Sequence, residues 1–229
     1  MQIDPETGRY IERWFWTLEA LAEAVDITPD HAVELIDAGC APGPIYVLGK
    51  HGWWSALGDD PMPAGEAWYS PGAAWWLRRA VLACRAGASP DEAAAMARER
   101  FVAGFVDALD SIAHAARAFP GCFIDDSIDS DAARAAARHE WQSWIDGGYG
   151  VCLRVFTPES CIAKESLGAA MKAGLASGSY DPSILLDQAE SLAGLILPFA
   201  PWQRPVGTPG RTNDRLLADQ ALGQERSYA

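Results

Sequence analysis

The amino-acid sequence predicts a mainly α-helical fold, in which a helix-turn-helix-like N-terminal module packs on a helical bundle. A capping residue followed by proline recurs along the chain and marks helix starts. These pairs are Thr28-Pro29, Ser70-Pro71, Ser89-Pro90, Thr157-Pro158 and Asp181-Pro182. Between residues 101 and 116, apolar side chains recur at three- and four-residue spacing, the period of an amphipathic helix. Strand-like patterns are few, so helices are expected to supply the core.

The N-terminal module is assigned to residues 1–60. Residues 21–39, LAEAVDITPDHAVELIDAG, have the outline of two short helices joined by a turn. The following stretch, IYVLGKHGWW at residues 45–54, has two β-prone arms around glycines and predicts a small β-hairpin. Residues 55–69 contain several Gly and Pro turns and are interpreted as a linker.

The helical bundle is assigned to residues 61–202, with a C-terminal tail at 203–229. Ser89 and Glu92 form a capping-box pattern at the start of the predicted central helix, residues 90–118. Further helices are expected from about Pro71, from about Asp131, after Pro158, and from Pro182 to near Pro198. The apolar run VCLRVF at 151–156 is a second strand candidate.

The charge distribution argues against a transcriptional regulator. The whole chain has 18 Lys and Arg against 31 Asp and Glu, a net charge of −13. Residues 17–39 contain six acidic residues and no Lys or Arg, and residues 1–60 contain 3 basic against 11 acidic residues. Because DNA binding needs cations at the phosphates, we expect no nucleic-acid partner and no anionic membrane surface. The acidic face is either solvated or a docking site for a basic partner.

Cysteine usage and hydropathy predict a cytoplasmic protein. The five cysteines are widely spaced and contain no CxxC pair, which suggests neither a disulfide framework nor a zinc site. The N-terminus lacks the basic and apolar regions of a secretory signal. The longest uncharged apolar stretch, residues 191–202, is shorter than the ~20 residues needed to span a bilayer.

Two segments far apart in the chain resemble the two ends of one known family. The first, residues 15–46, closes on Cys40, Pro42, Pro44 and Tyr46. The second, residues 139–165, contains Trp144, Gly148, Tyr149, Gly150, Cys152, Thr157, Pro158, Glu159, Lys164 and Glu165. Together they resemble an uncharacterised bacterial family labelled as natural product biosynthesis proteins. The resemblance implies a pathway and no particular reaction, and it brings no catalytic residue with it.

The segment YGVCLRVFTPESCIAKE contains thiols and an adjacent lysine and glutamate. On a helix that starts at Pro158, Cys161 and Glu165 share a face, with Lys164 beside them. A buried Lys–Glu pair, or a thiol such as Cys161 or Cys152 near a helix start, can be tuned for proton transfer or nucleophilic attack. The alternative is structural: a solvated lysine and two thiols that fill the core.

Trp141 and Trp144 lie close to His139, Glu140 and Asp146, and this acidic-aromatic set could line a pocket for a cationic or aromatic ligand. The alternative is that the two indoles form the core face of their helix. Zinc is not indicated, because His139 lacks a second histidine four residues on.

The stretch IDDSIDSD matches the DDxxD pattern of magnesium-binding isoprenoid enzymes, through Asp125, Asp126 and Asp129. Such carboxylates on one helix face can share Mg²⁺ ions that bind a diphosphate. The run follows Pro120 and precedes a helix, however, where Asp and Ser are expected as caps. We therefore expect no metal and no cofactor, and keep these aspartates as weak candidates.

The leading hypothesis is an accessory or ligand-binding protein of a bacterial natural product biosynthesis pathway. Its expected ligand-binding residues are Trp141, Trp144, Tyr149, Glu159, Lys164 and Glu165. The expected partner is a small molecule, a peptide or a pathway enzyme, and a homodimer is kept as an alternative arrangement. The alternative function is an enzyme of natural product biosynthesis, for which magnesium dependence through the DDxxD pattern is one option. A transcriptional regulator is a further alternative, which the acidic module disfavours.

Overall fold

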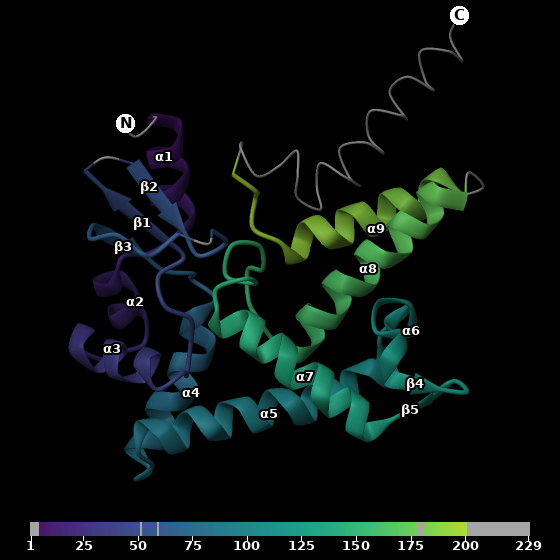
Figure 1. Ribbon diagram of the computed structural model, residues 1–229, viewed down its shortest axis with the longest axis horizontal. Helices are drawn as coiled ribbons and strands as arrows, with labels where there is room; N and C mark the ends of the chain where they lie inside the picture. Colours follow the sequence, from purple (N-terminus) through teal and green to yellow (C-terminus); the bar gives the residue numbers. More distant parts are fainter. Residues whose placement is uncertain (1–4, 51, 59, 178–180, 201–229) are drawn as a thin grey trace, which may run out of the picture.

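A computed structural model of the chain describes residues 5–50, 52–58, 60–177 and 181–200. Helices dominate this part of the chain, which confirms the mainly α-helical fold (Figure 1). Predicted features of the tail, residues 203–229, lie outside the described residues. None of the described helices is both long and apolar enough to cross a membrane.

The N-terminal part consists of three helices, α1 (Pro5–Trp14), α2 (Leu18–Ala24) and α3 (Pro29–Asp37). Helices α2 and α3 form the predicted helix-turn-helix-like pair, and each starts at a threonine cap. The Thr17 and Thr28 hydroxyls each accept a hydrogen bond from the backbone N–H three residues on. The pair is tied to the rest of the molecule by Arg78, whose guanidinium donates to the Ala24 carbonyl at 2.9 Å.

A small antiparallel sheet follows, with strand order β2-β1-β3. Its strands are β1 (Tyr46–Gly49), β2 (Gly52–Ser55) and β3 (Glu66–Trp68). The first two form the predicted hairpin. The third strand corrects the interpretation of residues 55–69 as a linker. It forms because Gly65 allows a close backbone approach: a Cβ at that position would lie 2.5 Å from the Leu48 carbonyl oxygen.

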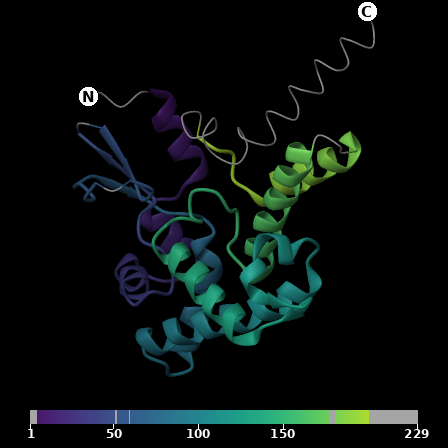
Figure 2. The ribbon, with the colours of Figure 1, turned by 45° about the vertical axis from the view of Figure 1, so that its right-hand side comes forward.

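The remaining helices are α4 (Ala73–Arg85), α5 (Pro90–Ser111), α6 (Ala115–Ala118), α7 (Ser130–Ile145), α8 (Pro158–Ser177) and α9 (Pro182–Leu195). Helix α5 begins with the predicted capping box, in which Ser89 and Glu92 bond to each other's backbone N–H. It packs against α4, α7 and α8 and crosses the base of the molecule in both views (Figures 1 and 2). Helix α4 begins two residues later than expected, because Pro71 and Gly72 form a turn.

The central helix ends earlier than predicted. Helix α5 stops at Ser111, Ile112 is extended, and His114 adopts a left-handed conformation with φ 67°. Past this break the chain still contributes to the core: Ala115 on α6 is buried, and the Phe119 ring packs at 5.2 Å against Phe105. The expected strand at 151–156 is likewise absent, apart from an isolated bridge between Leu153 and Ile196. Burial of the loop explains its apolar composition.

The core between α4, α5 and α7 is an aromatic cluster. Phe156, on the loop before α8, stacks between Phe101 at 4.7 Å and Trp144 at 4.8 Å. The indole N–H of Trp76 donates to the Phe156 carbonyl at 2.7 Å, and Trp141 packs edge-on against Trp76. Much of the high tryptophan content therefore serves the core. The buried cluster is continuous from residues of the N-terminal module to residues of the bundle, while the domain boundary at residue 60 stays a prediction.

Candidate binding site around Tyr149

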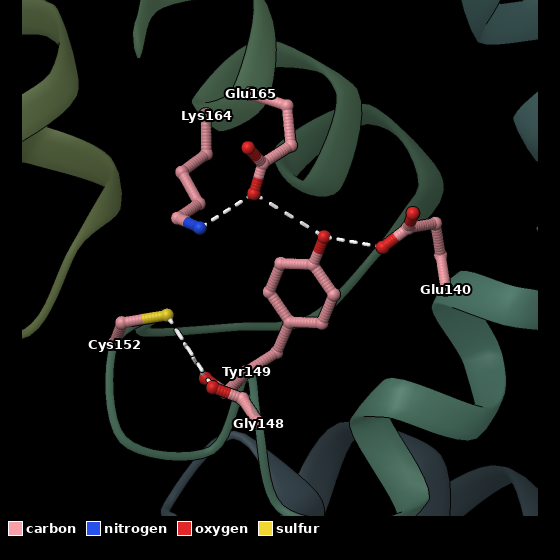
Figure 3. Close-up of polar contacts among 6 residues, drawn as sticks. All are labelled: Glu140, Gly148, Tyr149, Cys152, Lys164 and Glu165. Carbon is pink, nitrogen blue, oxygen red and sulfur yellow. Dashed lines mark hydrogen bonds and ion pairs between the residues drawn. The ribbon is translucent and has the colours of Figure 1, made fainter. Parts of the chain in front are cut away.

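A glycine-rich turn between α7 and α8 positions the Tyr149 side chain. Gly147 has φ +88°, a conformation that favours glycine. A Cβ at Gly150 would lie 2.3 Å from the Ile45 Cδ1, so this position has no space for a larger residue. The turn packs against Ile45 and directs the Tyr149 ring between α7 and α8 (Figure 3).

Polar contacts link Tyr149 to both flanking helices (Figure 3). Its hydroxyl donates to Glu140 Oε2 on α7 at 2.5 Å and lies 3.3 Å from Glu165 Oε1 on α8. The Lys164 ammonium donates to the same Glu165 oxygen at 2.6 Å and lies 4.9 Å from the centroid of the Tyr149 ring. These four residues, Glu140, Tyr149, Lys164 and Glu165, are called the Tyr149 network below.

The phenol has one proton and two carboxylate neighbours, and the distances show how it is shared. The 2.5 Å contact assigns the proton to the bond with Glu140. Glu165, at the longer distance, receives its short hydrogen bond from Lys164 instead. Each carboxylate therefore has its own donor: Tyr149 for Glu140 on α7, and Lys164 for Glu165 on α8. The Tyr149 hydroxyl lies between the two carboxylates.

The titratable groups behind the carboxylates have raised pKa values, through burial for the phenol and the thiols and through neighbouring acidic groups for the lysine. Burial, followed by the nearby Cys161 and Glu165, raises the pKa of Tyr149 well above its usual value. Burial also raises the pKa of Cys161, whose side chain is fully buried. Burial opposes the charge on Lys164, but the charges of Cys152, once that thiol ionises at alkaline pH, and of Glu165 outweigh it, so the pKa of Lys164 is raised. Burial raises the pKa of Cys152 too, so at neutral pH the counter-ion of Lys164 is Glu165, which accepts its hydrogen bond at 2.6 Å.

The two carboxylates reach an open groove of about 640 Å³ on the surface. Two cations, Arg117 and Lys172, line the same groove, together with Phe119 and small apolar side chains. The groove is thus lined by two carboxylates, two cationic side chains and several apolar side chains. This arrangement can bind a ligand that carries both a positive and a negative group.

The structure brings together three of the predicted site residues, Tyr149, Lys164 and Glu165. Glu159 is exposed at the start of α8 and lines a different pocket. Trp141 and Trp144 are buried in the aromatic core and line none of the described pockets, so the predicted aromatic wall is a core face.

Glu140 also belongs to the network; by sequence it falls in the acidic-aromatic set around Trp141 but not among the expected ligand-binding residues. Its position carried a signal, because it lies three residues after Ala137 and four before Trp144, both fully buried on α7. A carboxylate that borders an apolar helix face needs a donor, and Tyr149 supplies it.

The cysteines of this segment are core residues. Cys152 and Cys161 are buried, and the Cys152 thiol lies 3.8 Å from the Gly148 carbonyl oxygen (Figure 3). Because their pKa values are raised, neither provides a thiolate at neutral pH. This geometry supports the core-filling alternative over a nucleophile.

The DDxxD aspartates do not share a helix face. Asp125 and Asp126 form the left-handed turn between strands β4 (Phe123–Ile124) and β5 (Ser127–Ile128). Asp129 caps α7 by accepting hydrogen bonds from the backbone N–H groups of Asp131 and Ala132. Within the described ranges, no three His, Cys, Asp or Glu side chains converge in a way that could hold a metal ion.

The fold and the site define a mainly helical protein with a buried tyrosine–carboxylate–lysine network under an open, charged groove. Residues 97–220 match the family model described as "Family of unknown function (DUF6058)", and the chain belongs to that family. The matched segment contains every member of the Tyr149 network. No curated protein and no solved structure matches the chain significantly.

Proposed function

We propose that this protein is an accessory, ligand-binding protein of a bacterial natural product biosynthesis pathway, and that its ligand occupies the groove over the Tyr149 network. The pathway assignment rests on the resemblance of residues 15–46 and 139–165 to proteins with that label. The ligand is a small molecule or peptide with an amine and an acidic group. A pathway enzyme that presents such a segment is the alternative partner.

The observation that carries the proposal is that Glu140 and Glu165, each held by a hydrogen bond from Tyr149 or Lys164, line one groove with Arg117 and Lys172. Tyr149, Cys152, Cys161 and Lys164 all have raised pKa values, so at neutral pH they are a phenol, two thiols and an ammonium. A general base or nucleophile needs the deprotonated form, and a useful base titrates near the working pH. The network is therefore suited to holding two carboxylates in place.

Charge complementarity gives the ligand class. Glu140 and Glu165 line the groove as acceptors for an ammonium, while Arg117 and Lys172 line it as donors to a carboxylate or phosphate. Tyr149 and Lys164 each hold one carboxylate, which lowers the conformational entropy lost when the ligand binds.

The test is complementation of a deletion strain, with the pathway product measured by mass spectrometry. Glu140→Gln removes one charge and keeps the shape, and Tyr149→Phe removes only the hydroxyl. Because hydrogen bonds to charged groups contribute about 1.5–3 kcal/mol, we expect either variant to lower product formation about tenfold or more. Melting temperatures should fall by less than about 4 °C.

Asp131→Asn is the matched control, because Asp131 is exposed on the same helix α7 as Glu140 and lines none of the described pockets. It should complement as well as the wild type. Wild-type product formation by both Glu140→Gln and Tyr149→Phe would refute the assignment of the binding site to this groove.

A further inference from the structure

We propose that the groove between α4 and α5 is a second binding site, for an organic anion with an apolar chain, whose acidic group lies between Arg79 and Arg100. Two adjoining pockets share these arginines as lining residues. Neither pocket includes a residue of the Tyr149 network, so the site is independent of the groove proposed above.

The groove changes in character along its length. Beyond the arginines it is apolar over about 430 Å³, with Leu82 and Met96 on its walls and alanines from both helices. Leu82 and Met96 are 63% and 59% exposed, although both are large apolar side chains. On the other side of the arginines the groove holds about 370 Å³ and reaches Trp75 and the start of α8. A ligand with an apolar chain attached to an acidic group would place the chain in the apolar part and the acidic group between the arginines.

Arg79 is held in position before any ligand binds. Its guanidinium donates to the Trp75 carbonyl at 2.9 Å and stacks over the Trp75 ring at 3.7 Å from the centroid. These contacts fix the plane of the guanidinium and leave other N–H groups to donate. A preorganised guanidinium loses less conformational entropy when it binds an anion.

The two arginines repel each other, and among the described residues neither forms an ion pair within 4.0 Å with an acidic side chain, although the chain has 31 acidic residues. Both arginines line the same two pockets, and burial, followed by the charge of Arg100, lowers the pKa of Arg79. Glu159 is the acidic side chain that lines this groove, and it too forms no ion pair within the described part of the chain. An anion between the arginines would relieve their repulsion.

The first turn of α8 also favours a bound anion. Gly104, one turn after Arg100 on α5, lets α8 approach, because a Cβ there would lie 2.9 Å from Pro158 Cγ. The N-terminus of this 20-residue helix therefore lies next to the arginines, and its dipole adds positive potential.

The length of the apolar half indicates the size of the chain. From Arg100 to Ala93, both of which line this half, α5 rises about 10 Å at 1.5 Å per residue. The extended chain of octanoate is of comparable length. Carboxylate and phosphate have the same pairing chemistry with arginine, so octanoate and octyl phosphate serve as probes of the two sources.

The experiment is isothermal titration calorimetry of the full-length protein, at probe concentrations below micelle formation. Octanoate, octyl phosphate or both should bind the wild type with measurable heat. Octanol and octylammonium keep the chain but lack the negative charge, and acetate keeps the charge but lacks the chain. Each of these three should bind about tenfold more weakly or worse than the better anionic probe, because charge-assisted hydrogen bonds and chain burial both contribute.

The variants are Arg79→Gln and Arg100→Gln, each expected to weaken the better anionic probe about tenfold or more. Arg100 is exposed, so its variant should keep the wild-type melting temperature and stays informative if Arg79→Gln destabilises α4. Arg98→Gln is the matched control, because Arg98 lies two residues away on α5, lines neither pocket and pairs with Glu99. Its affinity should be unchanged.

Three results would overturn the proposal. The first is the absence of binding by both octanoate and octyl phosphate. The second is wild-type affinity in Arg100→Gln. The third is octanol binding as tightly as the anionic probes, since that would reduce the groove to an apolar surface with no role for the arginines.

Discussion

Phe156 and Tyr149 lie on the same loop, and their ring centroids are only 5.0 Å apart, yet they belong to regions of opposite character. Phe156 is fully buried between two aromatic rings. Tyr149 is also buried, but its hydroxyl binds the side chains of charged residues that reach a surface groove. The difference teaches that abundance of aromatic residues does not mark the binding site here. The site is marked by a ring whose hydroxyl contacts two carboxylates.

Trp144 illustrates the energetics of the aromatic region. Its indole N–H is buried and has no hydrogen-bond acceptor among the described residues. Such a group costs about 1–3 kcal/mol. Burying roughly 150–250 Å² of ring contributes roughly 4–6 kcal/mol at about 25 cal/mol per Å², so packing outweighs the loss. In the Tyr149 network, hydrogen bonding outweighs packing, because a carboxylate that is partly removed from water needs a donor however well its neighbours pack.

The largest expected effect comes from truncating the shared loop on its aromatic side. Phe156→Ala removes a ring that stacks on both Phe101 and Trp144, and it should lower the free energy of unfolding by about 3–5 kcal/mol. Urea denaturation followed by far-ultraviolet circular dichroism measures this change. Val155→Ala is the control, since Val155 is 39% exposed and should cost well under half as much. Equal costs for the two variants would contradict the account of Phe156 as the centre of the core.

The fold was predictable where its signals are local. Helix caps act within four residues, so Thr28, Ser89 and Asp181 identified their helices correctly. Events that depend on distant contacts were not predictable. The break after Ser111 leaves the helical spacing of apolar residues intact, and strand β3 forms only because Gly65 can approach β1.

A smaller effect is expected at the joint between the shared loop and the N-terminal module. Gly150→Ala would place a methyl group 2.3 Å from Ile45 Cδ1, and the repacking should cost about 1–3 kcal/mol in the free energy of unfolding. Ile45→Ala removes the clashing atoms, so the double variant should lose less than the sum of the two single variants. Thermal and urea denaturation of the four proteins measure this coupling.

Gly168→Ala on α8 is the matched control, because a Cβ there meets no atom within 4 Å. It should raise stability by about 0.5–1 kcal/mol, as expected for glycine to alanine inside a helix. If the changes in the free energy of unfolding of Gly150→Ala and Ile45→Ala are strictly additive, the loop and the N-terminal module are not in energetically significant contact at these two residues.

The candidate site was predictable in part. Tyr149, Lys164 and Glu165 lie within one short stretch, so their proximity follows from a turn between two helices. Glu140 joins them from the preceding helix, and its role depends on which way α7 faces. Whether Trp141 and Trp144 line a pocket or the core could not be predicted, because their burial is decided by the packing of α4 and α5 against α7.

The smallest expected effect concerns the thiols behind the Tyr149 ring and appears only at alkaline pH. Burial raises the pKa of Cys161 well above the 9.0 of an exposed thiol. Below about pH 9 both folded and unfolded chains keep this proton, and the stabilisation is intact. Above that pH the unfolded chain loses the proton first, so the free energy of unfolding should fall by at most about 1.4 kcal/mol per pH unit for this group.

Cys161→Ala removes this titration and should reduce the fall in stability above about pH 9 by the share that this thiol contributes. Urea denaturation at several pH values measures the slope. Ile162→Val is the control, because it reduces packing at the next fully buried position without changing any titratable group, and its curve should run parallel to that of the wild type. A Cys161→Ala curve that is also parallel would mean that this thiol is no harder to ionise in the folded protein. The polar region would then be better solvated than its burial indicates, and the contrast with the aromatic region would be weaker.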